Sequence, residues 1–186
     1  MQIRKFQASD REPIKVITAI CFEGVSVDHA IEQRHGLVNG HDWRYRKVRH
    51  IDSDIAANAD GIFVAVVQDA PTAESLVQGV EEVEPLQAQM TEQVIGYITT
   101  RIDHDTLIGG IPNLGVLPAY RGQGIGRKLI ETAIAYAKAQ GMAFVRIETL
   151  AHNAIGQTLY PSCGFVEVAR QVHYVLPLDD LREEEK

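Results

Sequence analysis

The stretch GVLPAYRGQGIGRKLI, residues 115–130, decides the fold that we expect for this chain. A short apolar run is followed by Arg121 and by glycines at alternate positions, Gly122, Gly124 and Gly126, before an amphipathic helical pattern begins. A strand that leads through glycines into a helix is typical of an anion site, because the first helical N–H groups are unpaired and the helix dipole adds partial positive charge. The sequence therefore predicts a turn that binds phosphate through its backbone.

Two known phosphate-binding patterns do not match this turn. The loop of P-loop NTPases requires G-x-x-x-x-G-K-[ST], whereas Gly122 is followed by Arg127-Lys128-Leu129, in the wrong register and without a hydroxyl for magnesium. The dinucleotide fingerprint requires a third glycine where Arg127 or Leu129 stands. A P-loop is therefore excluded, and dinucleotide binding is the least favoured of three alternatives.

A second motif follows further along the chain. The run NAIGQTLYPSCGF, from Asn153 to Phe165, has the spacing N-x-x-x-x-x-L-Y-x-x-x-G-F. Together with R-x-x-G-x-G at Arg121–Gly126 and V-x-P at Val116–Pro118, it resembles the GNAT superfamily of N-acetyltransferases, over about residues 92–176. Gly156 departs from the family pattern, which usually has alanine at that position.

The order of apolar patterns predicts a mixed α/β domain with a βαβ unit at 111–150. The resemblance implies a GNAT-like, mostly antiparallel sheet flanked by helices. We expect one domain over 1–178, with 69–91 as an insertion or long connection and 179–186 as an acidic tail. Strands are predicted at Gln2–Phe6, Gly61–Val67, Val94–Ile102, Ile111–Val116, Ala143–Leu150 and Phe165–Leu176. Helices are predicted at 9–21, with a capping box at Ser9–Glu12, and at 27–38, 43–59, 124–140 and 153–163.

Composition limits the classes of function. The chain has 186 residues, 45% of them hydrophobic and 23% charged, and a net charge of −7, which argues against general nucleic-acid binding. Its two cysteines, Cys21 and Cys163, form no CxxC pair, and its histidines, His173 included, show no metal-ligand spacing. We found no signal-peptide pattern and no membrane-length apolar run, so a cytoplasmic protein without a metal or a membrane partner is expected.

The resemblance assigns roles to particular residues. It implies acetyl-CoA as co-substrate, with pantetheine lying in a V-shaped cleft between the strands at 111–117 and 143–150. The Val116 N–H is expected to polarise the thioester carbonyl, and Tyr160 to protonate or hydrogen-bond the departing thiolate. The cofactor-binding residues implied by the motifs are Leu114, Val116, Arg121, Gly122, Gln123, Gly124, Ile125, Gly126, Asn153 and Tyr160.

The general base is not assigned by the sequence. Some relatives have a glutamate in the strand before the glycine turn, but this chain has glycines at 109 and 110. The remaining candidates are Glu148, His152, His104 and Asp105, with Asn113 as a polar residue that could orient a water.

The basic stretch 44–49 is the unusual local feature. Its cations, Arg44, Arg46, Lys47 and Arg49, lie in the first half of a predicted helix, where they oppose the helix dipole. A solvated helix face is one interpretation. The alternative is that they meet an anionic acceptor, the 3′-phosphate of CoA or a partner subunit.

The function expected from these motifs is transfer of acetyl from acetyl-CoA to a primary amine, by direct attack in a ternary complex. The acceptor, a small molecule or a protein, is left open, and the resemblance is compatible with a homodimer. The alternative from another class is a non-catalytic acyl-CoA-binding sensor or scaffold of the same fold. Release of free CoA in the presence of an amine distinguishes the two.

Overall fold

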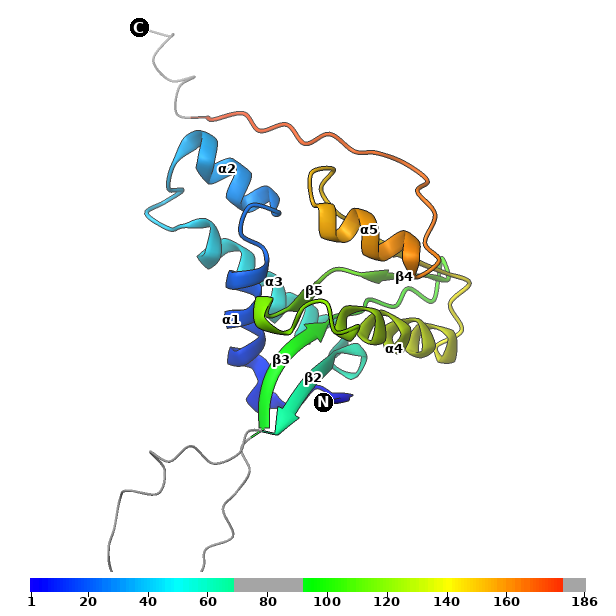
Figure 1. Cartoon of the computed structure of the whole chain (residues 1–186). Coiled ribbons are helices and arrows are strands. Elements are labelled where there is room, and N and C mark those ends of the chain that lie inside the picture. Colours follow the sequence, from blue (N-terminus) through cyan, green and yellow to red (C-terminus); the bar gives the residue numbers. More distant parts are fainter. Residues whose placement is uncertain (69–91, 179–186) are drawn as a thin grey trace, which may run out of the picture.

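The computed structural model describes residues 1–68 and 92–178, so the predicted insertion at 69–91 and the tail at 179–186 lie outside the described residues. The centre is an antiparallel sheet in the order β1-β2-β3-β5 (Figure 1). Its strands are β1 (Gln2–Lys5), β2 (Phe63–Gln68), β3 (Glu92–Ile98) and β5 (Leu114–Val116). A separate parallel pair joins β4 (Ile108–Ile111) to β6 (Phe144–Ile147).

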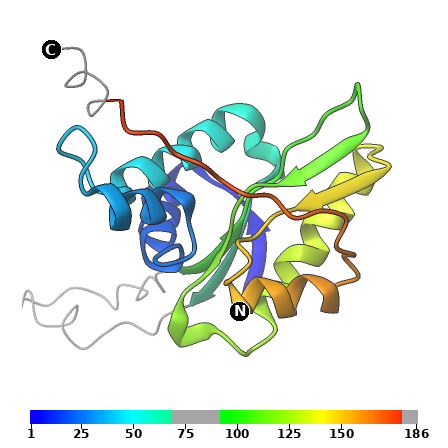
Figure 2. The same cartoon turned by 90° about the horizontal axis from the view of Figure 1, so that it is seen from above.

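Helices cover both faces of the sheet (Figure 2). One side carries α1 (Arg11–Cys21), α2 (Val27–His35) and α3 (Trp43–Asn58), and the other carries α4 (Ile125–Ala139) and α5 (Ala154–Ser162). Short 3-10 turns occur at Ala8–Asp10, Ala59–Gly61 and Pro118–Tyr120. The predicted mixed fold with a mostly antiparallel sheet is therefore confirmed.

The alternation of side chains along β2 explains the layers. Val64 and Val66 pack with Ile14 and Ile17 of α1, whereas Phe63 and Ala65 pack in the cluster that holds the apolar face of α4. Since successive strand residues point to opposite faces, one uninterrupted apolar run serves both cores.

The strand predicted at 111–116 is divided in two. Ile111 ends β4, which pairs with β6, and Leu114 begins β5, which pairs with β3. Pro112 has no N–H to donate to a neighbouring strand, and the backbone carbonyl of Asn113 instead accepts from the Thr99 N–H at 2.9 Å. The resemblance implied a cleft between two continuous strands. In the structure, the separation of β5 from β6 begins at this break in the chain.

Two other local predictions were wrong. No strand forms at 165–176 within the described residues: the chain runs extended after α5, and Val168 and Tyr174 are 95% and 90% exposed. Alternating apolar residues give the pattern of a strand, but a strand also needs a neighbouring strand with which to pair. β6 is only four residues long. The capping box predicted at Ser9–Glu12 also does not form before α1. The buried Asp10 carboxylate instead accepts a hydrogen bond from the Gln7 N–H at 2.8 Å.

Candidate active site

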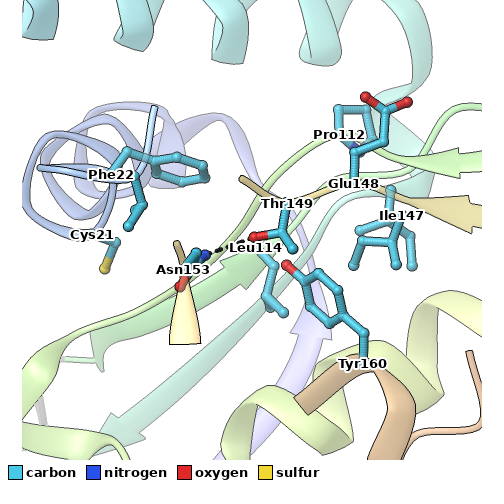
Figure 3. Close-up of a pocket in the computed structure, with 11 residues that line it drawn as sticks. Cys21, Phe22, Pro112, Leu114, Ile147, Glu148, Thr149, Asn153 and Tyr160 are labelled. Atoms are coloured by element: carbon cyan, nitrogen blue, oxygen red, sulfur yellow. Dashed lines mark hydrogen bonds between the residues drawn. The ribbon is translucent and has the colours of Figure 1, made fainter. Parts of the chain in front are cut away.

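A small cavity of about 70 Å³ lies where β5 and β6 separate (Figure 3). Segments far apart in the sequence contribute to it: the end of α1 and the following loop, the β4–β5 break, the end of β6, and α5. The lining residues are Cys21, Phe22, Val25, Ile111, Pro112, Leu114, Ile147, Glu148, Thr149, Asn153 and Tyr160. Apolar side chains share the wall with a carboxylate, a hydroxyl, an amide and a phenol.

The backbone of β5 has one edge that faces away from the sheet. Asn113 and Leu117 direct their backbone groups toward β3, since Thr99 N–H donates to Asn113 O and Leu117 N–H donates to Ile95 O, both at 2.9 Å. In an antiparallel pair these orientations alternate, so Leu114 and Val116 direct their N–H and C=O groups to the opposite edge. There the Val116 carbonyl accepts from the Cys21 thiol at 3.2 Å and from Arg121 Nε at 3.0 Å.

The glycine turn that follows β5 leaves the start of α4 without a side-chain cap. Gly122 and Gly124 both have φ of 76°, the left-handed conformation that glycine adopts without strain. Lys128 N–H makes the first bond of the helix, to Gly124 O at 3.1 Å, and within the described residues the N–H groups of the turn before it have no hydrogen-bond partner. Gln123 and the core residue Ile125 complete this turn.

The third glycine of the motif has a different role. A Cβ on Gly126 would lie 3.1 Å from Leu159 Cδ2, so this glycine allows α4 to pack closely against α5. Arg127 strengthens the same contact by donating to the Ser162 carbonyl at 2.7 Å. The turn therefore needs bare backbone for conformation at two positions and for helix packing at the third.

The glycine at position 156, where the family pattern usually has alanine, also has a steric explanation. A Cβ there would lie 2.6 Å from Thr149 Oγ1, and that hydroxyl accepts from Asn153 Nδ2 at 2.8 Å. Asn153 in turn caps α5, its Oδ1 accepting from the Gly156 N–H at 3.3 Å. Thr149 and Asn153 occupy the space that an alanine methyl would need.

Tyr160 and Glu148 approach the cavity from different elements. Tyr160 extends from α5 with its hydroxyl directed toward Leu114 and Thr149, and Glu148 lies beside Pro112 with its carboxylate directed away from the phenol (Figure 3). Burial raises the pKa of Tyr160 to about 12, so its hydroxyl stays protonated at neutral pH. The arrangement places a proton donor and a carboxylate on one cavity without direct contact between them.

The other candidates for the base lie elsewhere. His152 is exposed and hydrogen-bonds through Nε2 to the Gly24 carbonyl at 2.8 Å. Asn113 is buried behind the cavity wall, and neither His104 nor Asp105, both in the turn before β4, lines the cavity.

A buried polar network supports the wall at Asn113. The fully buried Asp54 accepts from Thr99 Oγ1 at 2.7 Å, from Asn113 Nδ2 at 2.6 Å and from Arg101 at 2.8 Å. Lys47 Nζ donates to Asn113 Oδ1 at 2.9 Å and lies 4.2 Å from the centroid of the Phe22 ring. Burial lowers the pKa of Lys47, and the negative charges of Asp28 and Asp54 oppose that shift.

The basic stretch makes contacts within the chain. Arg44 pairs with Glu23 at 3.1 Å, and Arg46 lies 3.6 Å from Asp28. Acidic side chains of α2 and the preceding loop therefore meet Arg44 and Arg46, while Lys47 is buried and does not belong to a solvated helix face.

Sequence reasoning missed one wall of the cavity. Cys21, Phe22 and Val25 lie more than a hundred positions before Tyr160, and no spacing in the sequence connects them. The apolar face of the first helix, which includes Cys21, was the one available signal, and it indicates burial only.

The described residues, 1–68 and 92–178, contain neither a candidate membrane span nor a candidate metal cluster. No helix there is long and apolar enough to cross a membrane. In the same ranges, no three or more His, Cys, Asp or Glu side chains are grouped so as to hold a metal ion.

Comparison with known proteins bears on this arrangement. Residues 46–165 match the model of the acetyltransferase (GNAT) family. The [ribosomal protein bS18]-alanine N-acetyltransferase of Haemophilus ducreyi is 36% identical over 85 residues, 45% of this chain and 55% of that protein. The mycothiol acetyltransferase of Jonesia denitrificans is 26% identical over 151 residues, 76% of this chain and 48% of that protein.

The chain thus spans about half the length of the curated relatives it matches. Among solved structures, the NatC complex bound to Gag peptide and CoA has a TM-score of 0.61 and 20% identity, over 95% of this chain and 92% of that one, which shows a shared fold. The family match spans most of α3, the strands of the central sheet other than β1, the glycine turn and α5. This chain belongs to the GNAT acetyltransferase family.

Proposed function

We propose that the protein is an N-acetyltransferase that moves the acetyl group of acetyl-CoA to a primary amine by direct attack in a ternary complex. The observation that carries the proposal is the outward backbone edge of Leu114 and Val116, which leads directly into the uncapped start of α4. A strand edge can pair with an extended amide chain, and an uncapped helix start binds phosphate. The pantetheine of CoA is such an extended amide chain, and its pyrophosphate supplies the phosphates.

The residues of the turn divide the binding between them. The Arg121 N–H donates to the Pro118 carbonyl at 3.2 Å, so the backbone amides from Gly122 to Gly126 are those that bind the pyrophosphate in this proposal, and Leu114 and Val116 hold the pantetheine. Acetyl-CoA supplies the activated acetyl group, and the Val116 N–H stabilises negative charge that develops on its thioester oxygen. Arg121, whose Nε donates to the Val116 carbonyl, fixes the strand end relative to the turn.

Two cavity side chains supply the proton transfers. Tyr160 is the proton donor to the CoA thiolate, because its buried hydroxyl is directed into the cavity and stays protonated (Figure 3). Glu148 is the base for the amine, directly or through a water, because it is the one carboxylate among the residues that line the cavity.

The acceptor that best fits is an α-amine, as at a peptide N-terminus. At pH 7 about a tenth of α-amines with a pKa near 7.8 are neutral, against about one in 2,500 lysine amines with a pKa near 10.4. A site whose one carboxylate, that of Glu148, has a side chain 75% exposed to solvent is better matched to the first group. Two relatives bear names that fit such acceptors: the bS18-alanine enzyme and the N-alpha-acetyltransferase 30 of Saccharomyces cerevisiae, 34% identical over 85 residues.

The test is release of free CoA, detected with a thiol reagent, from acetyl-CoA and peptides with free N-termini. We expect turnover by the wild type, and kcat/KM lowered about tenfold by Glu148→Gln, because water replaces an exposed base in part. Glu131→Gln, on the exposed side of α4, is the matched control and is expected to match the wild type. Tight binding of acetyl-CoA without CoA release from any amine would favour the sensor or scaffold.

Gly124→Val tests the phosphate turn. We expect Kd for acetyl-CoA, measured by calorimetry, to rise about 10- to 100-fold, since a left-handed φ strains a β-branched residue by roughly 1–3 kcal/mol and the new side chain obstructs the turn. Gly141→Val is the control, because Gly141 at the other end of α4 has φ of 78° and equally open surroundings. Both variants lose similar stability, and equal loss of acetyl-CoA binding in both would contradict a phosphate role for the turn.

A further inference from the structure

The two rims of the cavity are joined by one hydrogen bond. Phe22 and Val25 come from the loop between α1 and α2, and Thr149 and Asn153 flank the loop between β6 and α5. Between these loops, His152 Nε2 lies 2.8 Å from the Gly24 carbonyl, across a sequence separation of 128 residues. A carbonyl oxygen only accepts, so Nε2 of His152 carries the proton.

Gly24 is held from its other side as well. Its N–H donates to Nδ1 of His29, in a loop where Gly24 has a left-handed φ of 72°. The His29 ring stacks on Trp43 with centroids 4.9 Å apart, and Trp43 is 1% exposed. The Gly24 loop is therefore fixed to α3 through a buried aromatic residue, and among the hydrogen bonds of the described residues only that of His152 joins it to the β6–α5 loop.

The size of the cavity shows what this connection excludes. A volume of about 70 Å³ is small beside the roughly 300–1,000 Å³ of sites that take whole ligands. With the rims joined, the space left for the acceptor beside the acetyl group is therefore small. A bulky group on the carbon next to the amine requires the rims to part.

We propose that the hydrogen bond from His152 to Gly24 limits the size of the acceptor amine, which makes His152 a specificity-determining residue. The proposal rests on the proposed acetyltransferase function. One hydrogen bond between exposed groups contributes about 0.5–1.5 kcal/mol, so its removal raises the fraction of molecules with parted rims about 2- to 12-fold. The same factor appears in the apparent affinity for an acceptor that binds only the parted form.

The activity test uses two peptides that differ only in an N-terminal glycine or phenylalanine. We expect His152→Ala to raise kcat/KM for the phenylalanine peptide about 2- to 12-fold while leaving the glycine peptide and the KM for acetyl-CoA unchanged. His152→Gln retains an N–H donor and is expected to keep the wild-type preference. His104→Ala, in the turn before β4, is the control for removal of an exposed histidine. An unchanged ratio between the peptides in His152→Ala would overturn the proposal.

A second measurement does not depend on turnover. Trp43 is the one tryptophan of the chain, so its fluorescence reports on the His29 contact. We expect stronger acrylamide quenching in His152→Ala than in the wild type or His152→Gln, because a released loop uncovers the indole. If no peptide is acetylated, the proposed function fails while quenching still decides whether His152 holds the loop. Identical quenching in all three proteins would overturn the inference.

Discussion

Tyr160→Phe is expected to lower kcat by about 10²- to 10⁴-fold, the usual contribution of a positioned general acid, with the KM for acetyl-CoA changed only a few-fold. The phenylalanine ring retains the packing of Tyr160 on Phe165, whose ring centroid lies 6.3 Å away, so the variant is expected to fold. What is lost is the hydroxyl directed into the cavity (Figure 3). Steady-state kinetics by CoA release measures the effect.

Tyr136→Phe is the matched control. Tyr136 OH donates to Asn58 Oδ1 at 3.0 Å, and Tyr136 is not among the residues that line the cavity, so its loss is expected to leave kcat unchanged. Near-wild-type kcat in Tyr160→Phe would identify Tyr160 as a packing residue.

The pH profile gives an independent check on Tyr160. Because burial raises its pKa to about 12, the acid form is fully present below about pH 11 and is lost only as the pH rises through 12. The wild-type rate on an α-amine is therefore expected to rise as the amine deprotonates near pH 8 and to stay level through pH 10. A decline between pH 8 and 10 would contradict the role of Tyr160 as the acid.

Asp54→Ala is expected to lower the free energy of unfolding by about 3–5 kcal/mol, because it leaves two buried donors, at about 1–3 kcal/mol each, without their shared acceptor. Asn113 Nδ2 and Thr99 Oγ1 both donate to this carboxylate from buried positions. The Arg101 side chain is half exposed and is hydrated in the variant, so the loss of stability comes mainly from Asn113 and Thr99. Urea denaturation measures the change, and for a chain of this size the Tm is expected to fall by about 6–20 °C.

Asp52→Ala is the control on the same helix. Asp52 accepts from Arg11 at 2.8 Å and from Lys15 at 2.9 Å, but its side chain is 38% exposed, so its removal is expected to cost less than about 1 kcal/mol. If the two variants lose similar stability, the network at Asp54 does not support the strand break.

Local sequence was sufficient for the strand–turn–helix unit. Gly122 and Gly124 adopt the left-handed conformation that alternating glycines at a helix start predict, and the start of α4 lacks a side-chain cap. These properties depend on residues within one turn of each other, so no distant partner is needed to specify them. Gly126 is different, since the residue that requires its missing side chain is Leu159 in α5.

Local sequence was not sufficient for the segment that follows α5. Residues 165–176 alternate as a strand does, yet the structure leaves them extended and exposed, because pairing depends on a sheet edge elsewhere in the fold. The division of the strand at Pro112 was likewise missed, although the proline itself was visible. Its consequence depends on Thr99 and Asp54, which hold Asn113 from other elements.

The sequence by itself therefore determined the family resemblance, the mixed α/β fold and the backbone conformation of the glycine turn, because short-range sterics and periodicity control all three. Only the tertiary structure decided which side chains share the cavity. Phe22 and Tyr160 line one cavity, and His152 meets Gly24, through packing on both faces of the central sheet, which closes loops of more than a hundred residues. Such contacts are stabilised by burial and complementary shape, which leave no fixed spacing in the sequence.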